Sequence, residues 1–198
     1  GLTHEPWSRS LHATGCRSPK ILWVVLVINA SMFVVEMTAG IRAGSSSRQA
    51  DALDFLGDSA SYIISLMVLT ASLRWRAGAA MLKAASMIAF GLWVLGITIW
   101  YLMQGGVPAA MVMGSIGTLA LVANVVSAAL LLGFRTGDSN MRLVWLCSRN
   151  DTIGNVAVIL AAGAVFWLGS RWPEAIVAFI MAGLALTAAW PRIMSSTR

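Results

Sequence analysis

The chain is organised around the sequence Ala50-Asp51-Ala52-Leu53-Asp54-Phe55-Leu56-Gly57-Asp58. Its carboxylates begin an apolar run that is long enough to cross a bilayer as a helix. Spacings of three and then four residues place Asp51, Asp54 and Asp58 on one stripe of that helix. A carboxylate inside a membrane span is costly and usually has a functional role. We therefore expect Asp54 and Asp58 to face the interior of a helix bundle.

The composition is that of an integral membrane protein. Hydrophobic residues make up 58% of the 198 residues and charged residues only 11%, and the mean hydropathy is +0.78. A soluble domain this apolar could not cover its surface with polar groups. The two cysteines, Cys16 and Cys147, imply no disulfide framework. We expect an all-α integral membrane protein.

Six apolar runs predict a six-transmembrane-helix bundle. A polar N-terminal tail, residues 1–20, precedes a transmembrane domain of residues 21–194. We expect the spans at about 21–43, 49–73, 79–103, 109–133, 143–169 and 174–190. No C-terminal cytoplasmic domain is expected, since few residues follow the sixth span.

The basic residues are distributed unequally between the two sides of this bundle. With six spans both termini lie on one side, and the segments on that side hold ten Lys and Arg residues. The opposite loops hold three, namely Arg42, Arg48 and Arg171, and Arg149 lies within the fifth span. The positive-inside rule then predicts cytoplasmic termini. We expect the membrane to be the inner (plasma) membrane of a bacterium. The net charge of +6 is explained by these loop residues, so nucleic acid is not an expected partner.

A second pair of polar residues, Cys147 and Asp151, repeats the spacing of four in the fifth span. Carboxylates buried together repel each other, and a divalent cation removes that conflict. Aspartate and cysteine are both zinc ligands, and a thiolate favours Zn²⁺ or Cd²⁺ over Mg²⁺ or Ca²⁺. At 1.5 Å rise per residue, Asp58 and Asp151 both fall near the bilayer midplane. We predict that Asp54, Asp58, Cys147 and Asp151 hold a divalent metal ion.

Four further residues are expected to support these ligands or to line a path for protons: Asn29, Glu36, Asp51 and Asn155. Glu36 could carry protons or pair with a buried donor, and Asp51 could cap its helix, line an access path or bind the metal. Asn155 is better suited to a hydrogen bond between helices than to ligation. Glu174, which follows Pro173, is expected to be a charge at the start of its own helix.

Three motifs along residues 21–194 form a combined pattern: a first-span set (Asn29, Phe33, Glu36 and Gly40), the Ala50–Asp58 stretch, and Asp151-Thr152-Ile153-Gly154-Asn155-Val156-Ala157-Val158. With this pattern and six spans in the same order, the chain resembles the cation diffusion facilitator family of divalent metal transporters. It looks like a short form of that family. Members of the family usually have a cytoplasmic metal-binding domain after the sixth span, where this sequence has only a few residues. The family usually has histidine where this chain has Cys147.

The resemblance implies a function and a set of ligands. It implies a homodimeric exporter of Zn²⁺ or Cd²⁺ that works by exchange with protons, with Asp54, Asp58, Cys147 and Asp151 as ligands. Its partners would be the divalent metal ion, protons, the lipid bilayer and a second copy of the chain. No cofactor is expected beyond the transported ion.

Two other functions remain open at this point. Residues that bind a metal do not prove turnover, so the chain could be a membrane metal sensor or a partner subunit that does not transport. Asp58 and Asp151 could also form the pair of an intramembrane aspartyl protease. The Gly-x-Gly-Asp arrangement is absent, however, and Asp54 and Cys147 would then have no role. Measurement of metal flux separates these functions.

Overall fold

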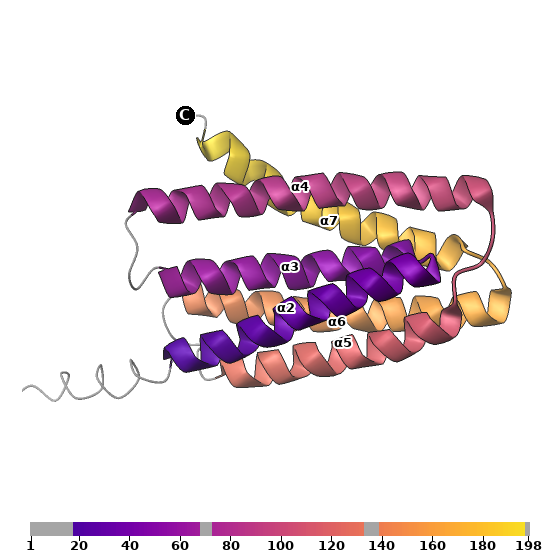
Figure 1. Ribbon diagram of the computed structural model, residues 1–198, viewed down its shortest axis with the longest axis horizontal. Coiled ribbons are helices and arrows are strands. Elements are labelled where there is room, and N and C mark those ends of the chain that lie inside the picture. The colour runs from indigo at the N-terminus through magenta and orange to yellow at the C-terminus, as the bar shows by residue number, and fades with distance from the viewer. Residues whose placement is uncertain (1–17, 68–72, 133–138, 197–198) are drawn as a thin grey trace, which may run out of the picture.

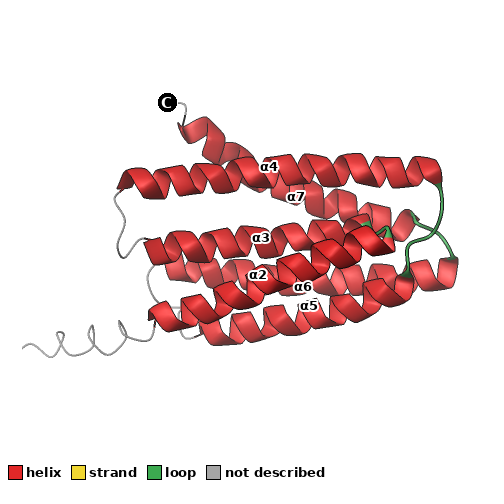
Figure 2. Ribbon diagram, viewed as in Figure 1, coloured by secondary structure: helices red, strands yellow, loops and turns green. Residues whose placement is uncertain are grey.

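The structure is a computed structural model that describes residues 18–67, 73–132 and 139–196, without the side chains at 18, 73, 76, 139–150 and 188–196. These ranges contain helices and no β-strand (Figure 2). The helices are α2 (Ser18–Ala43), α3 (Ser46–Met67), α4 (Leu73–Gln104), α5 (Ala110–Leu131), α6 (Ser139–Leu168) and α7 (Trp172–Ser196). The prediction of an all-α bundle with six long helices is confirmed.

Four of the helices contain segments long and apolar enough to cross a membrane: Pro19–Ala43, Ala77–Gln104, Ala110–Leu131 and Asp151–Leu168. α7 has a shorter apolar part, Trp172–Thr187. α3 has 22 residues and is about 33 Å long at 1.5 Å per residue, which also suffices. Its hydropathy is low because its first thirteen residues include one arginine and three aspartates. The expected second span ran to residue 73, whereas Leu73 is the first residue of α4.

The helices run alternately up and down, so their connections gather at two ends (Figure 1). The links 44–45, 105–109 and 169–171 lie at one end, which we call the short-loop end. The start of α2 and the end of α7 lie at the opposite end, the terminal end. α3 packs against α2, α4, α6 and α7 and is therefore the central helix. α7 slants away from α3 toward the terminal end (Figure 1).

Burial of polar residues is reversed relative to a soluble protein. Asn29, Glu36, Arg48, Asp51 and Asn155 are fully buried. Large apolar side chains point outward instead, among them Leu82, Leu92, Met103, Leu160, Trp167 and Leu184. Lipid can cover such an apolar surface, whereas ionisable side chains in a membrane domain must turn inward. This distribution agrees with a multi-pass membrane protein.

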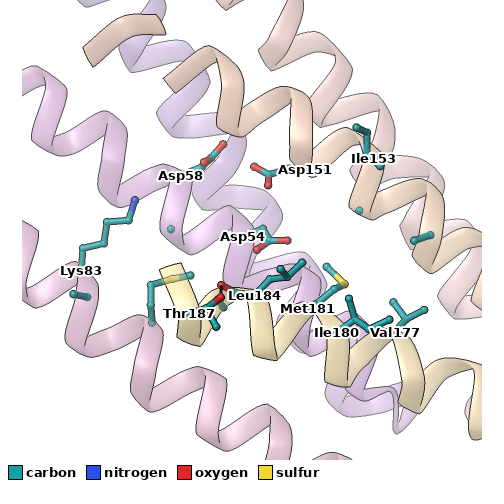
Figure 3. A pocket seen from close by; sticks show the side chains of 16 residues that line it. Asp54, Asp58, Lys83, Asp151, Ile153, Val177, Ile180, Met181, Leu184 and Thr187 are labelled. Carbon is teal, nitrogen blue, oxygen red and sulfur yellow. Dashed lines mark hydrogen bonds between the residues drawn. The ribbon is translucent and has the colours of Figure 1, made fainter. Parts of the chain in front are cut away.

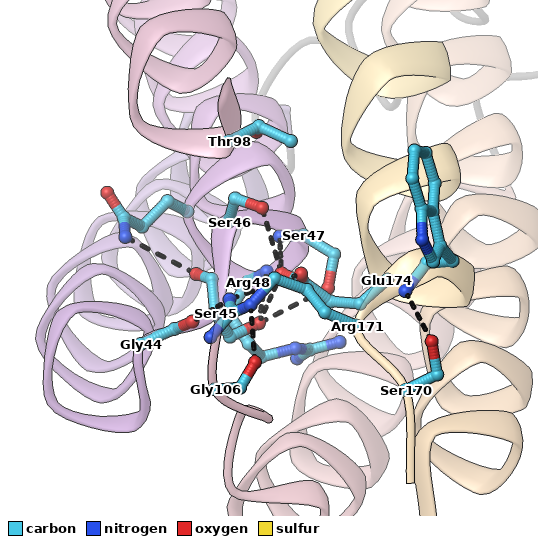
Figure 4. A network of polar contacts seen from close by, with 12 residues as sticks. Gly44, Ser45, Ser46, Ser47, Arg48, Thr98, Gly106, Ser170, Arg171 and Glu174 are labelled. Atoms are coloured by element: carbon cyan, nitrogen blue, oxygen red, sulfur yellow. Dashed lines mark hydrogen bonds and ion pairs between the residues drawn. The ribbon is translucent and has the colours of Figure 1, made fainter. Parts of the chain in front are cut away.

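The first turn of α3 is capped by its own serine and by a side chain from α7. The Ser45 hydroxyl accepts a hydrogen bond from the Arg48 N–H at 3.2 Å, which makes Ser45 the N-cap. Glu174 Oε1 accepts from the Ser46 hydroxyl at 2.9 Å and from the Ser47 N–H at 2.7 Å (Figure 4). A carboxylate at a helix N-terminus is stabilised by the unpaired N–H groups and by the helix dipole. Glu174 thus joins α7 to α3 at the short-loop end.

Arg171 connects the three links of the short-loop end. Its Nη1 donates to the Gly44 carbonyl at 2.7 Å, and its Nε donates to the Gly106 carbonyl at 2.9 Å. The guanidinium carbon also lies 4.9 Å from the ring centroid of Tyr101. Both glycines have positive φ, +62° and +83°, which L side chains rarely adopt, and this geometry presents their carbonyls to the arginine. The short-loop end is therefore closed by polar contacts.

Candidate metal centre

The three aspartates of α3 form a row along one side of this central helix. Asp54 and Asp58 lie about 12 and 18 Å from Ser46 along the axis, by 1.5 Å per residue, and so near the middle of the helix. Asp51 is 0% and Asp58 5% exposed, while Asp54 is partly exposed. The order and the single face agree with the expectation from spacing. The three aspartates differ in their surroundings, because Asp51 packs among other residues than Asp54 and Asp58 do.

Asp54 and Asp58 line a cavity of about 700 Å³ between α3, α4, α6 and α7 (Figure 3). Asp151 of α6 and Lys83 of α4 contribute to the same wall. The remaining lining is mostly apolar and comes largely from α6 and α7: Gly57, Ala84, Met87, Ile153, Gly154, Ala157, Val177, Ile180, Met181, Leu184, Ala185 and Thr187. An apolar cavity with a few converging polar groups is the usual form of a small-ligand site.

Asp58 is the most constrained carboxylate in this cavity. Its Oδ2 accepts a hydrogen bond from the Tyr62 hydroxyl at 2.9 Å, and Tyr62 is itself fully buried. The carboxyl groups of Asp58 and Asp151 lie within hydrogen-bonding reach of each other. Two carboxylates this close repel each other unless a proton or a cation lies between them. Helices α3 and α6 thus create a position that favours a cation.

Three of the four predicted ligands, Asp54, Asp58 and Asp151, share the cavity, but they do not yet form a closed site. Among the described side chains, no three of His, Cys, Asp and Glu come close enough together to hold one metal ion. The fourth predicted ligand, Cys147, has its side chain outside the described set. Its backbone belongs to α6, one helical turn before Asp151.

A buried charge cluster lies nearer the short-loop end. Arg48 Nη1 is 2.6 Å from Glu36 Oε1 and 3.5 Å from Asp51 Oδ2, and all three side chains are buried. The expectation that Arg48 is a loop charge is wrong, because it lies in the first turn of α3 and points inward. Of the roles considered for Glu36, pairing with a buried donor is the one that the contacts show. Asp51 pairs with Arg48 and does not line the cavity.

Two glycines on neighbouring helices make room for Arg48. A Cβ added at Gly117 of α5 would lie 3.0 Å from Arg48 Nη2 and 3.0 Å from Ile159 Cγ1. A Cβ added at Gly40 of α2 would lie 3.0 Å from Arg48 Cβ. Contacts this short force a neighbour to move. The arginine is therefore held in a fitted space between α2, α3, α5 and α6.

The predicted asparagines have structural partners. Asn29 Nδ2 donates to the Val25 carbonyl at 2.8 Å and to the Ser127 hydroxyl at 3.3 Å, which ties α2 to α5. Asn155 Nδ2 donates to the Asp151 carbonyl of its own helix at 3.0 Å, so this bond does not join two helices as expected. Asn124, buried on α5, has no hydrogen-bond partner among the described residues.

Comparison with known proteins supplies a family. A profile of the cation efflux transmembrane domain matches residues 22–198. A cadmium, cobalt and zinc/H(+)-K(+) antiporter of Bacillus subtilis strain 168 is 24% identical over 181 residues, which are 84% of this chain and 58% of that protein. The antiporter of the same name from Bacillus velezensis is 23% identical over 189 residues, 88% of this chain and 60% of its own. The chain thus spans about three fifths of the length of these curated relatives.

Proposed function

The chain belongs to the cation efflux family, and from that premise we propose that it exports a divalent metal ion of the Zn²⁺/Cd²⁺ class from the cytoplasm in exchange for protons. Family membership confirms the resemblance to the cation diffusion facilitators. The observation that carries the proposal is the cavity in which carboxylates of α3 and α6 come together.

The proposed ligands are Asp54, Asp58 and Asp151, completed by Cys147 from the preceding turn of α6. Ligands must lose their protons to bind a metal, so metal entry releases protons and protonation releases the metal. A proton gradient directed into the cell could therefore drive export.

The two ends of the bundle support export from the cytoplasm as the direction of transport. The positive-inside rule supports a cytoplasmic terminal end, since most Lys and Arg residues belong to that side. The cavity extends along α4 and α7 toward that end, from Val177 to Thr187 on α7. The short-loop end is closed by Glu174 and Arg171. This arrangement supports a conformation that receives metal from the cytoplasm, and release would require the short-loop contacts to open.

Assembly and location belong to the same proposal. The resemblance supports a homodimer, and the named relatives, both from Bacillus, support the plasma membrane of a bacterium. The contact between Asp58 and Asp151 would also suit an aspartyl protease. Membership of a family of transporters argues against that reading. A sensor or partner subunit would bind metal without moving it.

Wild-type protein in liposomes with an acidic lumen is expected to take up Zn²⁺ or Cd²⁺ with saturation, reported by a metal-sensitive dye inside. Dissipating the pH gradient with an ionophore should lower the initial rate at least about fivefold, since protons supply the driving force. Metal binding to the purified protein should also release protons. Metal flux that does not depend on the pH gradient would contradict proton exchange. Metal binding without flux would indicate a sensor.

Cys147→His is expected to lower the ratio of Cd²⁺ to Zn²⁺ flux about tenfold, because a thiolate prefers the softer ion more strongly than an imidazole does. The measurement is the initial rate for each ion in the same liposomes. Cys16→Ser, which removes the other cysteine, is the control and should leave the ratio unchanged. An unchanged ratio in Cys147→His would remove Cys147 from the proposed ligands.

A further inference from the structure

Lys83 is an unusual residue for its position on α4. It is the single charged residue within Ala77–Gln104, one of the segments apolar enough to cross the membrane. It stands six residues into that segment, or about 9 Å from Ala77 along the axis. An ammonium at this depth is costly and needs partners. Lys83 was expected to be one of the charges of the cytoplasmic side, and that expectation leaves its role at this position unexplained.

The Lys83 side chain reaches the candidate metal centre. Its Nζ donates a hydrogen bond to the Ser61 hydroxyl of α3. The same side chain lines the cavity that holds Asp54 and Asp151 (Figure 3). Its ammonium is also close enough to Asp58 for Coulombic attraction. Lys83 therefore turns toward the carboxylates and does not extend to the membrane surface, as lysines near helix ends commonly do.

The charges around the cavity show what an ammonium can do there. The lining contains three carboxyl groups and one basic side chain, Lys83. Arg48, a fully buried cation of the same bundle, is paired with Glu36 and Asp51 outside the cavity, whereas Lys83 is partly exposed. Without metal, Lys83 offsets part of the charge of the carboxylates. With a divalent ion among the same carboxylates, its charge repels that ion.

We propose that Lys83 is a tethered counter-cation of the metal centre, which stabilises the empty site, weakens the hold on the bound ion and so promotes its release. This inference rests on the proposed metal transport and adds a residue that sets affinity and turnover. The simpler role for Lys83 is a hydrogen bond that joins α4 to α3 through Ser61. The counter-cation role depends on the charge of Lys83, whereas the joining role depends on its hydrogen bond to Ser61.

The test measures Zn²⁺ and Cd²⁺ affinity of the purified full chain by titration calorimetry, together with maximal flux in liposomes. Lys83→Met should bind the metal ion at least about tenfold more tightly. The repulsion between the ammonium and a nearby divalent ion exceeds the free energy of a tenfold change in affinity, even at an effective dielectric constant of about 20. Its maximal flux and its KM should both fall, because release slows. Lys83→Arg, which keeps the charge, should stay within about threefold of wild type.

Two controls separate charge from hydrogen bonding. Ser61→Ala removes the bond to Lys83 and leaves the ammonium, so affinity should stay near the wild-type value. Lys20→Met removes the chain's other lysine and should change nothing. If Lys83→Met does not purify as a monodisperse protein, Lys83→Gln, which retains a donor for Ser61, is held to the same criterion.

Unchanged or weaker binding in the neutral variants would overturn the proposal, as would Ser61→Ala behaving like Lys83→Met. These outcomes leave the proposed transport intact if wild-type protein still carries metal. Tighter binding by Lys83→Met in a protein that shows no flux would support the counter-cation and reject transport. A wild-type chain that binds no metal would reject both.

Discussion

Asp58→Asn is expected to abolish metal transport, with flux into liposomes more than about a hundredfold below wild type. Replacement of residues that merely support a ligand already costs 10–100-fold in affinity or activity, and loss of a ligand should cost more. Asp58 is the carboxylate that contacts Asp151 and holds the Tyr62 hydroxyl. Asparagine preserves the size of the side chain and can still accept from Tyr62. The loss should therefore appear in metal binding and leave the fold intact.

Ser59→Ala provides the matched control for Asp58→Asn. Ser59 is the next residue, is equally buried at 6% exposed, and its hydroxyl donates to the Phe55 carbonyl of its own helix. It does not line the cavity. The control should transport at more than about half the wild-type rate. If Asp58→Asn kept a third or more of wild-type flux, Asp58 would not be a ligand, and the centre would have to be sought elsewhere.

Arg48→Met is expected to destabilise the protein by about 3–5 kcal/mol, the usual cost of removing one partner from a buried ion pair. Methionine fills much of the space but leaves Glu36 and Asp51 without their cation. Glu36 Oε1 would lose its partner at 2.6 Å. The measurement is thermal unfolding in detergent, followed by tryptophan fluorescence or by loss of the monodisperse species.

A compensating variant tests whether charge is the cause. Adding Glu36→Gln and Asp51→Asn to Arg48→Met removes the uncompensated carboxylates, and this triple variant should recover at least about half of the lost stability. Gly117→Ala, which presses a methyl group toward the guanidinium, should destabilise the wild-type chain more than the Arg48→Met chain. If Arg48→Met unfolded at the wild-type temperature, the cluster would contribute nothing to stability.

Features set by local sequence were predictable. The six helices follow from the lengths of apolar runs, and the shared face of Asp54 and Asp58 follows from helical spacing. The similar depth of Asp58 and Asp151 followed from counting residues. Each of these properties depends on neighbours within one helix, which is why reading the chain was sufficient.

Features that depend on where a side chain turns were not predictable in the same way. Arg48 and Lys83 were each expected to be a charge at one side of the membrane. A count of charges carries no information about the direction in which a side chain points. The spacing of three between Arg48 and Asp51 was a usable signal for their ion pair. Glu174 was expected to serve its own helix, but it caps α3, whose Ser46 lies 128 residues earlier in the chain. Only the packing of α7 against α3 brings these residues together.

The Glu174 contact has a consequence for water. The donors at the start of α3 are satisfied by a carboxylate that belongs to α7, so the sealed end of α3 depends on the position of another helix. If α7 moved away in the proposed transport cycle, Ser46 and Ser47 would still need acceptors, and solvent would have to supply them. The conformation that releases metal would thus be a hydrated one. Opening would admit water to the first turn of the same helix that carries Asp54 and Asp58, and it would bring the protons that exchange requires.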